Sequence, residues 1–208
     1  MRSFSFFVLF LVLSASVRAS EPTDLGQGLT YLRINSLIKS AQDLRAALLR
    51  PAPLVLDLRY TTDEPGAADA LRELNSQPAK PKLYVLVSPA TPAAVAAILT
   101  ASSTPLVTLG VKDSIPTAQV IVAQTAEADR AAYDAFESGT PLDQLISGKI
   151  EKERFDEASL VHEFKNGNHD AQPPEAGPAK PGDSPRPPID RVLQRAVHLH
   201  RALLALRR

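Results

Sequence analysis

The residues of this chain best suited to chemistry are two hydroxyls and one amine. Ser88 and Thr91 follow the apolar run at 83–87, and Lys112 follows a second apolar run. A serine or threonine hydroxyl beside a lysine can form the nucleophile and base of a dyad hydrolase. One hypothesis is therefore a serine-type peptidase that uses Ser88 or Thr91 with Lys112. Against it, a surface lysine is protonated near neutral pH and then cannot act as a base.

A second group of candidates lies at the end of the apolar run at 54–58. Asp57 is the one polar residue of that run, and Arg59 follows it directly. Because apolar neighbours on both sides indicate a buried strand, we expect these two residues to form an ion pair or strand-end hydrogen bonds. This structural interpretation is favoured over ligand binding.

The four histidines do not predict a metal site. His198 and His200 are two residues apart, so on a helix they point in different directions. His162 and His169 lie on either side of an expected helix end. We expect neither a metal ion nor any other cofactor.

Apolar patterns predict the elements that position these residues. Thr91 and Pro92 have the residue types of an N-cap and a first helical position. Alternating strands and helices favour an α/β sandwich with a largely parallel sheet, followed by a helical extension. The expected strands are 29–34, 54–58, 83–87, 105–109 and 118–122, and the expected helices are 37–48, 67–74, 93–99, 127–137, 142–146 and 155–164.

Composition divides the chain into four parts. Residues 1–19 have the basic start, apolar centre and small-residue end of a signal peptide, so we expect export to the periplasm or medium of a bacterium. An uncleaved anchor is the alternative. Residues 20–165 form the expected domain, and the proline-rich stretch 166–188 is expected to be a disordered linker. Residues 189–208 are expected to form an amphipathic helix.

Cysteine and charge narrow the class further. The chain contains no cysteine, so an exported domain must be stabilised by a packed core. Basic and acidic residues number 23 each, a balance that argues against a nucleic-acid partner. Residues 189–208 carry five arginines against Asp190 alone. This basic segment is expected to contact its own domain, a partner protein or a membrane surface.

The order of these elements resembles a known enzyme family. Four segments in this order resemble the catalytic domain of the carboxyl-terminal processing, or tail-specific, serine peptidases. They are a strand ending Leu32-Arg33-Ile34, then Val55-Leu56-Asp57-Leu58-Arg59, then Tyr84-Val85-Leu86-Val87 with a capped helix, and finally Thr108-Leu109-Gly110. The resemblance covers about residues 28–122 and implies a Clp/crotonase-like fold. It extends weakly to the segment that starts at Asp190.

The resemblance also shows which reactive groups are missing. It implies a nucleophilic serine just inside the helix after the Val-Leu-Val strand, where this chain has Ala93. Alanine has no hydroxyl to attack a carbonyl. The family's glycine-rich oxyanion turn corresponds to residues 60–66, which contain one glycine and a proline. Lys112 is the nearest counterpart of the family's lysine base.

The sequence thus leads to two functional hypotheses. The first is an exported, non-catalytic relative of the processing peptidases that binds or scaffolds proteins or extended peptides, with Arg59, Tyr60 and Thr91 as candidate ligand-binding residues and no catalytic residue. Self-association is compatible with this fold class. The alternative is the peptidase with a relocated hydroxyl, at Ser88 or Thr91, and Lys112 as base.

Overall fold

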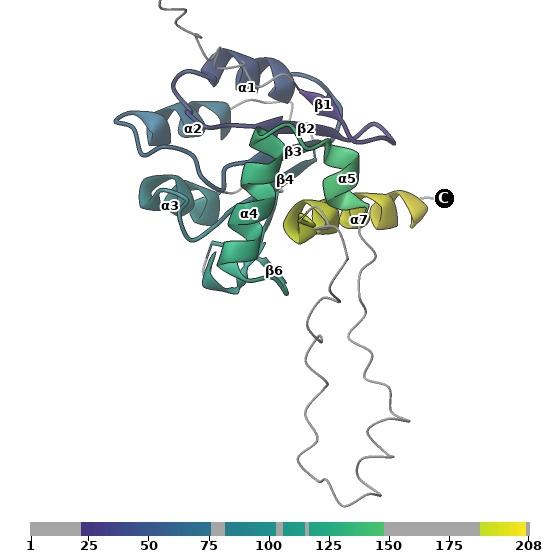
Figure 1. Ribbon diagram of the computed structural model, residues 1–208. Helices are drawn as coiled ribbons and strands as arrows, with labels where there is room; N and C mark the ends of the chain where they lie inside the picture. Colours follow the sequence, from purple (N-terminus) through teal and green to yellow (C-terminus); the bar gives the residue numbers. More distant parts are fainter. Residues whose placement is uncertain (1–21, 76–81, 103–105, 115–116, 148–187, 207–208) are drawn as a thin grey trace, which may run out of the picture.

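The strands form one mixed sheet whose spatial order follows the order of the chain (Figure 1). The molecule is known from a computed structural model that describes residues 22–75, 82–102, 106–114, 117–147 and 188–206. The short strand β1 is antiparallel to β2, and all later pairs are parallel. The strands are β1 (Thr23–Asp24), β2 (Thr30–Arg33), β3 (Leu54–Asp57), β4 (Leu83–Leu86), β5 (Leu106–Val111) and β6 (Val120–Val122).

Helices cover both faces of the sheet. Each crossover from β2 to β5 moves one strand further in the same direction, and right-handed crossovers of this kind place their helices on one face. That face carries α1 (Ala41–Leu48), α2 (Ala67–Asn75) and α3 (Ala93–Ala101). The opposite face carries α4 (Ala126–Glu137), α5 (Leu142–Ile146) and α7 (Arg191–Ala205) (Figure 1).

Two apolar cores result from the alternation of side chains along the strands. Leu54 and Leu56 of β3 pack with α1, α2 and α3, whereas Val55 between them packs with α5 and α7. Tyr84 and Leu86 of β4 join the second core. Because both faces are covered, the central strands are apolar at nearly every position, as parallel sheets require.

Most expected elements are present, with one shifted helix start and one additional strand. The sequence predicts a helix from 37, but α1 begins at Ala41, because the Ser36 hydroxyl accepts a hydrogen bond from the Lys39 amide and holds a turn there (3.2 Å). The sequence did not predict β1. The expected signal peptide at 1–19, the helix at 155–164 and residues 166–187 of the expected linker lie outside the described residues.

None of the helices described here is both long enough and apolar enough to cross a lipid bilayer.

Gly110 in β5 lies close against the turn η1 (Lys112–Ser114) and the backbone of Val87. A Cβ atom at this position would lie 2.7 Å from the Val87 carbonyl oxygen and 2.8 Å from the Ser114 Cβ. Backbone cannot move aside as a flexible side chain can. We expect Gly110→Ala to lower the free energy of unfolding by about 1–3 kcal/mol, the usual effect of overpacking. Urea unfolding measures it; an unchanged midpoint would show that the turn relaxes freely.

Candidate functional site

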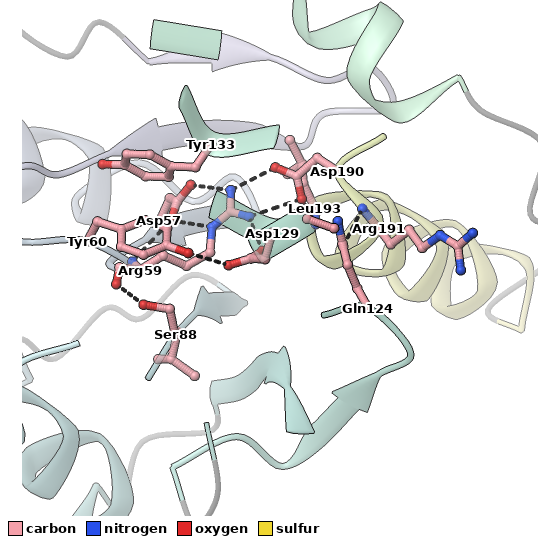
Figure 2. A network of polar contacts seen from close by, with 12 residues as sticks. Asp57, Arg59, Tyr60, Ser88, Gln124, Asp129, Tyr133, Asp190, Arg191 and Leu193 are labelled. Carbon is pink, nitrogen blue, oxygen red and sulfur yellow. Dashed lines mark hydrogen bonds and ion pairs between the residues drawn. The ribbon is translucent and has the colours of Figure 1, made fainter. Parts of the chain in front are cut away.

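The most unusual feature of the molecule is a buried arginine surrounded by three carboxylates (Figure 2). The Arg59 guanidinium has five N–H donors, and all five are used. Its Nε and Nη2 donate to Asp57 (3.0 and 2.8 Å), and Nη1 donates to Asp129 (2.7 Å). Nη1 and Nη2 also donate to Asp190 (3.1 and 2.7 Å). We call these four residues the Arg59 cluster.

Three separate elements bring the carboxylates together. Asp57 ends β3 at the carboxyl edge of the sheet, and Asp129 lies in the first turn of α4. Asp190 is the N-cap of α7, where its Oδ1 also accepts a hydrogen bond from the Leu193 amide (2.8 Å). The cluster therefore joins the sheet to both helices through fully formed hydrogen bonds.

A neighbouring amide fixes the start of α7. The Gln124 side chain donates to the Ile189 carbonyl (3.1 Å) and accepts from the Arg191 amide (3.1 Å). The Arg191 guanidinium donates to the Ala123 carbonyl (3.2 Å). Both sides of Asp190 are thus held in place, which fixes its carboxylate against Arg59 (Figure 2).

Tyrosines and a second arginine border the cluster. The Tyr31 hydroxyl donates to Asp57 Oδ2 (2.7 Å) and accepts from Arg33 Nε (3.2 Å). The Tyr60 hydroxyl lies 3.0 Å from Asp129 Oδ2. Asp57 and Asp129 thus each have a tyrosine hydroxyl as a polar partner in addition to Arg59.

Tyr133 of α4 closes the cluster on another side. The Arg33 guanidinium lies 3.7 Å from the centre of the Tyr133 ring, within the range of a cation–π contact, and donates to the Tyr133 carbonyl (3.1 Å). The Tyr133 hydroxyl donates to Asn35 (2.7 Å). Aromatic rings thus exclude water from the charges.

Burial and charge act in opposite directions on the acidic groups. For Asp57, burial acts to raise the pKa, but the Arg59 charge and hydrogen bonds outweigh it and the pKa is lowered. For Asp129, burial prevails over Arg59, and the nearby Asp190 adds to it, so the pKa is raised. Burial and the charge of Asp57 raise the pKa of Tyr133 to about 12. Asp57 and Asp129 therefore bind the same guanidinium, but their pKa values are shifted in opposite directions.

The structure places both candidate hydroxyls beside the backbone carbonyl of Arg59. The Ser88 hydroxyl donates to the Arg59 carbonyl and accepts from the Ala90 amide (3.2 Å). Thr91 Oγ1 accepts from the Ser88 amide (3.0 Å) and lies 3.1 Å from the Leu58 carbonyl. Both hydroxyls are buried and hold the backbone that follows β3.

Thr91 is not the helix cap that the sequence predicts. Pro92 occupies the N-cap position of α3, and Thr91 precedes it with its hydroxyl turned toward the sheet. The reason is the competing hydrogen bonds from the end of β3, which the local sequence does not reveal. Ala93, and not Pro92 as expected, is therefore the first residue of α3, and it is exposed.

Lys112 does not join these hydroxyls. It lies in η1 with its side chain exposed, and no hydrogen bond or ion pair links it to Ser88 or Thr91 in the part of the chain that the structure describes. The candidates for the relocated dyad thus follow the neighbouring strands β4 and β5, and among the described residues no hydrogen bond joins the lysine to either hydroxyl.

The candidate ligand-binding residues are committed to internal contacts. Arg59 and Thr91 are buried with polar partners inside the chain, and only Tyr60 is partly exposed. The Arg59 guanidinium itself fills the space between the three carboxylates. Among the described residues, no group of histidines and carboxylates is arranged to hold a metal ion. His200 is buried against the Gln27 carbonyl (3.2 Å).

The sequence predicted an ion pair or strand-end hydrogen bonds for Asp57 and Arg59, and the structure shows the ion pair at 2.8 Å. Sequence reasoning missed Asp129, Tyr31 and Tyr133. One available signal was the stripe of α4, where Asp129 shares a face with Ala132, Tyr133 and Phe136 at helical spacing. A carboxylate on an apolar stripe predicts a buried partner.

No model of a known protein family, no curated protein and no solved structure matches this chain.

Proposed function

We propose that this chain is an exported, non-catalytic protein with a Clp/crotonase-like domain that binds proteins or extended peptides. The export part rests on the composition of residues 1–19, and the fold name rests on the order of sequence elements. The peptide-binding part rests on the same resemblance. The single observation that carries the non-catalytic part is Ala93 at the exposed first position of α3.

Three features support the loss of catalysis. Alanine at 93 offers no nucleophile at the start of α3. The two nearby hydroxyls are buried and hydrogen-bonded to backbone that they hold in place. Lys112 is exposed, and among the described residues no hydrogen bond or ion pair joins it to either hydroxyl.

The alternative remains a peptidase that uses Ser88 or Thr91 with Lys112. For this reaction a hydroxyl must reach both the lysine and a substrate carbonyl. Ser88 would first have to give up its hydrogen bond to the Arg59 carbonyl, and Thr91 its contact with the Leu58 carbonyl. The geometry therefore favours the non-catalytic proposal.

Cleavage of an unstructured protein by the chain from Ser20 onward tests the proposal. We expect no peptide products by mass spectrometry, either for the wild type or for Ala93→Ser, because restoring one hydroxyl at an exposed position does not supply a base. Circular dichroism controls for folding. Cleavage that is retained through purification and lost in Ser88→Ala, Thr91→Val or Lys112→Ala would establish the peptidase alternative.

Peptide binding is tested separately. Fluorescence anisotropy with labelled fragments of the same unstructured protein should show saturable binding that Lys112→Ala leaves unchanged. Absence of binding by a folded sample would reject the binding part of the proposal while leaving the non-catalytic part standing.

A further inference from the structure

The charges of the Arg59 cluster do not balance. Arg59 contacts the carboxyl groups of Asp57, Asp129 and Asp190, and the one further guanidinium paired with them among the described residues is that of Arg33, whose Nε lies 4.0 Å from Asp57 Oδ2. All five side chains are buried. A buried uncompensated charge is costly, and an acidic group in such a place commonly takes up a proton instead. The count therefore raises the question of which carboxyl holds a proton.

The directions of the hydrogen bonds to Asp57 show that it is not the carboxyl group that holds the proton. Its Oδ1 accepts from the Arg59 amide (3.2 Å) and Nε, and its Oδ2 accepts from Nη2 and from the Tyr31 hydroxyl. The Tyr31 oxygen already accepts from Arg33 Nε, so its own proton points to Asp57. Asp57 therefore faces donors on every side and is held as the anion.

Asp190 is also surrounded by donors. Its Oδ1 accepts from the Leu193 amide and from Arg59 Nη1, and its Oδ2 accepts from Arg59 Nη2. Among the described residues no acceptor faces either oxygen. A proton on Asp190 would have no partner to receive it.

Asp129 differs in one partner. Its Oδ1 accepts from Arg59 Nη1, but its Oδ2 faces the Tyr60 hydroxyl, which can either donate or accept. When Asp129 is ionised the Tyr60 hydroxyl donates to Oδ2; a proton on Oδ2 reverses this hydrogen bond, and the partly exposed Tyr60 hydroxyl then turns its own proton to solvent. The direction of the Asp129 pKa, raised by burial, agrees with this assignment. The position of Asp129 in the first turn of α4 favours the anion, but this helix-end effect is small compared with full burial.

We propose that Asp129 holds the proton of the Arg59 cluster on Oδ2, shared with the Tyr60 hydroxyl, and that the attachment of α4 to the sheet tightens as the pH falls. Loss of this proton at higher pH leaves one excess negative charge inside the protein. Tyr60 is partly exposed, so the proton can exchange with solvent there. The titratable and charged groups that face the site are Tyr31 and Arg33 from β2, Asp57, Arg59 and Tyr60 from β3 and the segment after it, Arg130 and Tyr133 from α4, and Asp190 from α7.

The sign of the pH dependence follows from the raised pKa of Asp129. A carboxyl whose pKa is higher in the folded than in the unfolded state binds its proton more tightly when folded. Its contribution is therefore complete below the unfolded value of about 4 and is lost as the pH rises through the folded value. Each unit of difference changes the ratio of folded to unfolded protein about tenfold.

Asp129→Asn imitates the protonated form. The asparagine oxygen can accept from Arg59, and its amide can donate to Tyr60. We expect the melting temperature of Asp129→Asn to equal or exceed that of the wild type at pH 8, with the difference shrinking toward pH 4. Asp134→Asn is the matched control, because Asp134 lies on the same helix but in an exposed pair with Arg130. Its difference in melting temperature from the wild type should not change between pH 8 and pH 4 as that of Asp129→Asn does. Subtracting the wild-type plot of melting temperature against pH from that of the variant removes the contributions of the titrating groups that both proteins share.

Two outcomes would overturn the assignment. The first is an Asp129→Asn protein that is less stable than the wild type at pH 8 or fails to fold, since this would show that the anion is needed. The second is a carboxyl carbon-13 titration of wild-type protein in which Asp129 ionises at or below the usual range of an aspartate. A titration above that range, together with the expected melting curves, supports the proposal.

Discussion

Arg59→Ala is expected to unfold the chain at neutral pH. Arg59 is fully buried and is the shared partner of Asp57, Asp129 and Asp190. Removing one partner of a buried ion pair costs about 3–5 kcal/mol, and here three carboxylates lose the same partner. A typical domain has only about 5–15 kcal/mol of stability to lose. Far-UV circular dichroism during urea unfolding measures the effect.

Arg72→Ala is the control for Arg59→Ala. Arg72 pairs with Asp69 on the surface of α2, with both side chains mostly exposed, and such pairs contribute about 0–1 kcal/mol. Acid provides a second readout, because three unpaired buried carboxyls fold more readily when protonated. The Arg59→Ala protein should therefore regain structure as the pH is lowered. An Arg59→Ala protein as stable as the wild type at pH 7 would show that the cluster does not hold the fold.

Deletion of residues 189–208 is expected to abolish cooperative folding. The buried side chains of α7 include Val192, Leu193 and Val197, which pack in the core on the sheet face that α5 also covers. Burial of a valine or leucine stabilises a fold by about 1.5–3 kcal/mol, so these three side chains together rival the stability of a domain. The deletion also removes Asp190 from Arg59. Loss of a sigmoidal thermal transition is the measurement.

A shorter deletion is the control. Removing residues 205–208 takes away the exposed Ala205 and Leu206 and leaves the core of α7 intact, so the melting temperature should change little. A synthetic peptide of residues 188–206 added to the longer deletion should restore folded signal. If the chain without residues 189–208 melts like the full chain, α7 is not part of the core.

Local pattern explains why most elements were predictable. The runs at β3 and β4 are apolar at successive positions, and α4 and α5 have the spacing of helices, so each is specified by residues close in sequence. The α/β class follows from their alternation. The ends of elements were less predictable where a polar side chain just before an expected helix formed a hydrogen bond with backbone. Ser36 delays α1, and Thr91 turns away from α3 toward β3.

The sequence by itself determined the α/β class, placed Asp57 and Arg59 at the end of one buried strand, and has alanine in place of a hydroxyl residue at position 93. Only the tertiary structure decided that Arg59 also binds Asp129 and Asp190, which lie 70 and 131 residues further along the chain. A sequence pattern reports neighbours within a few residues, because helix and strand periods are short. Three carboxylates converge on one guanidinium only after the sheet, α4 and α7 have packed. Burial and the shared guanidinium then shift the pKa values of Asp57 and Asp129, and this environment exists only in the folded chain.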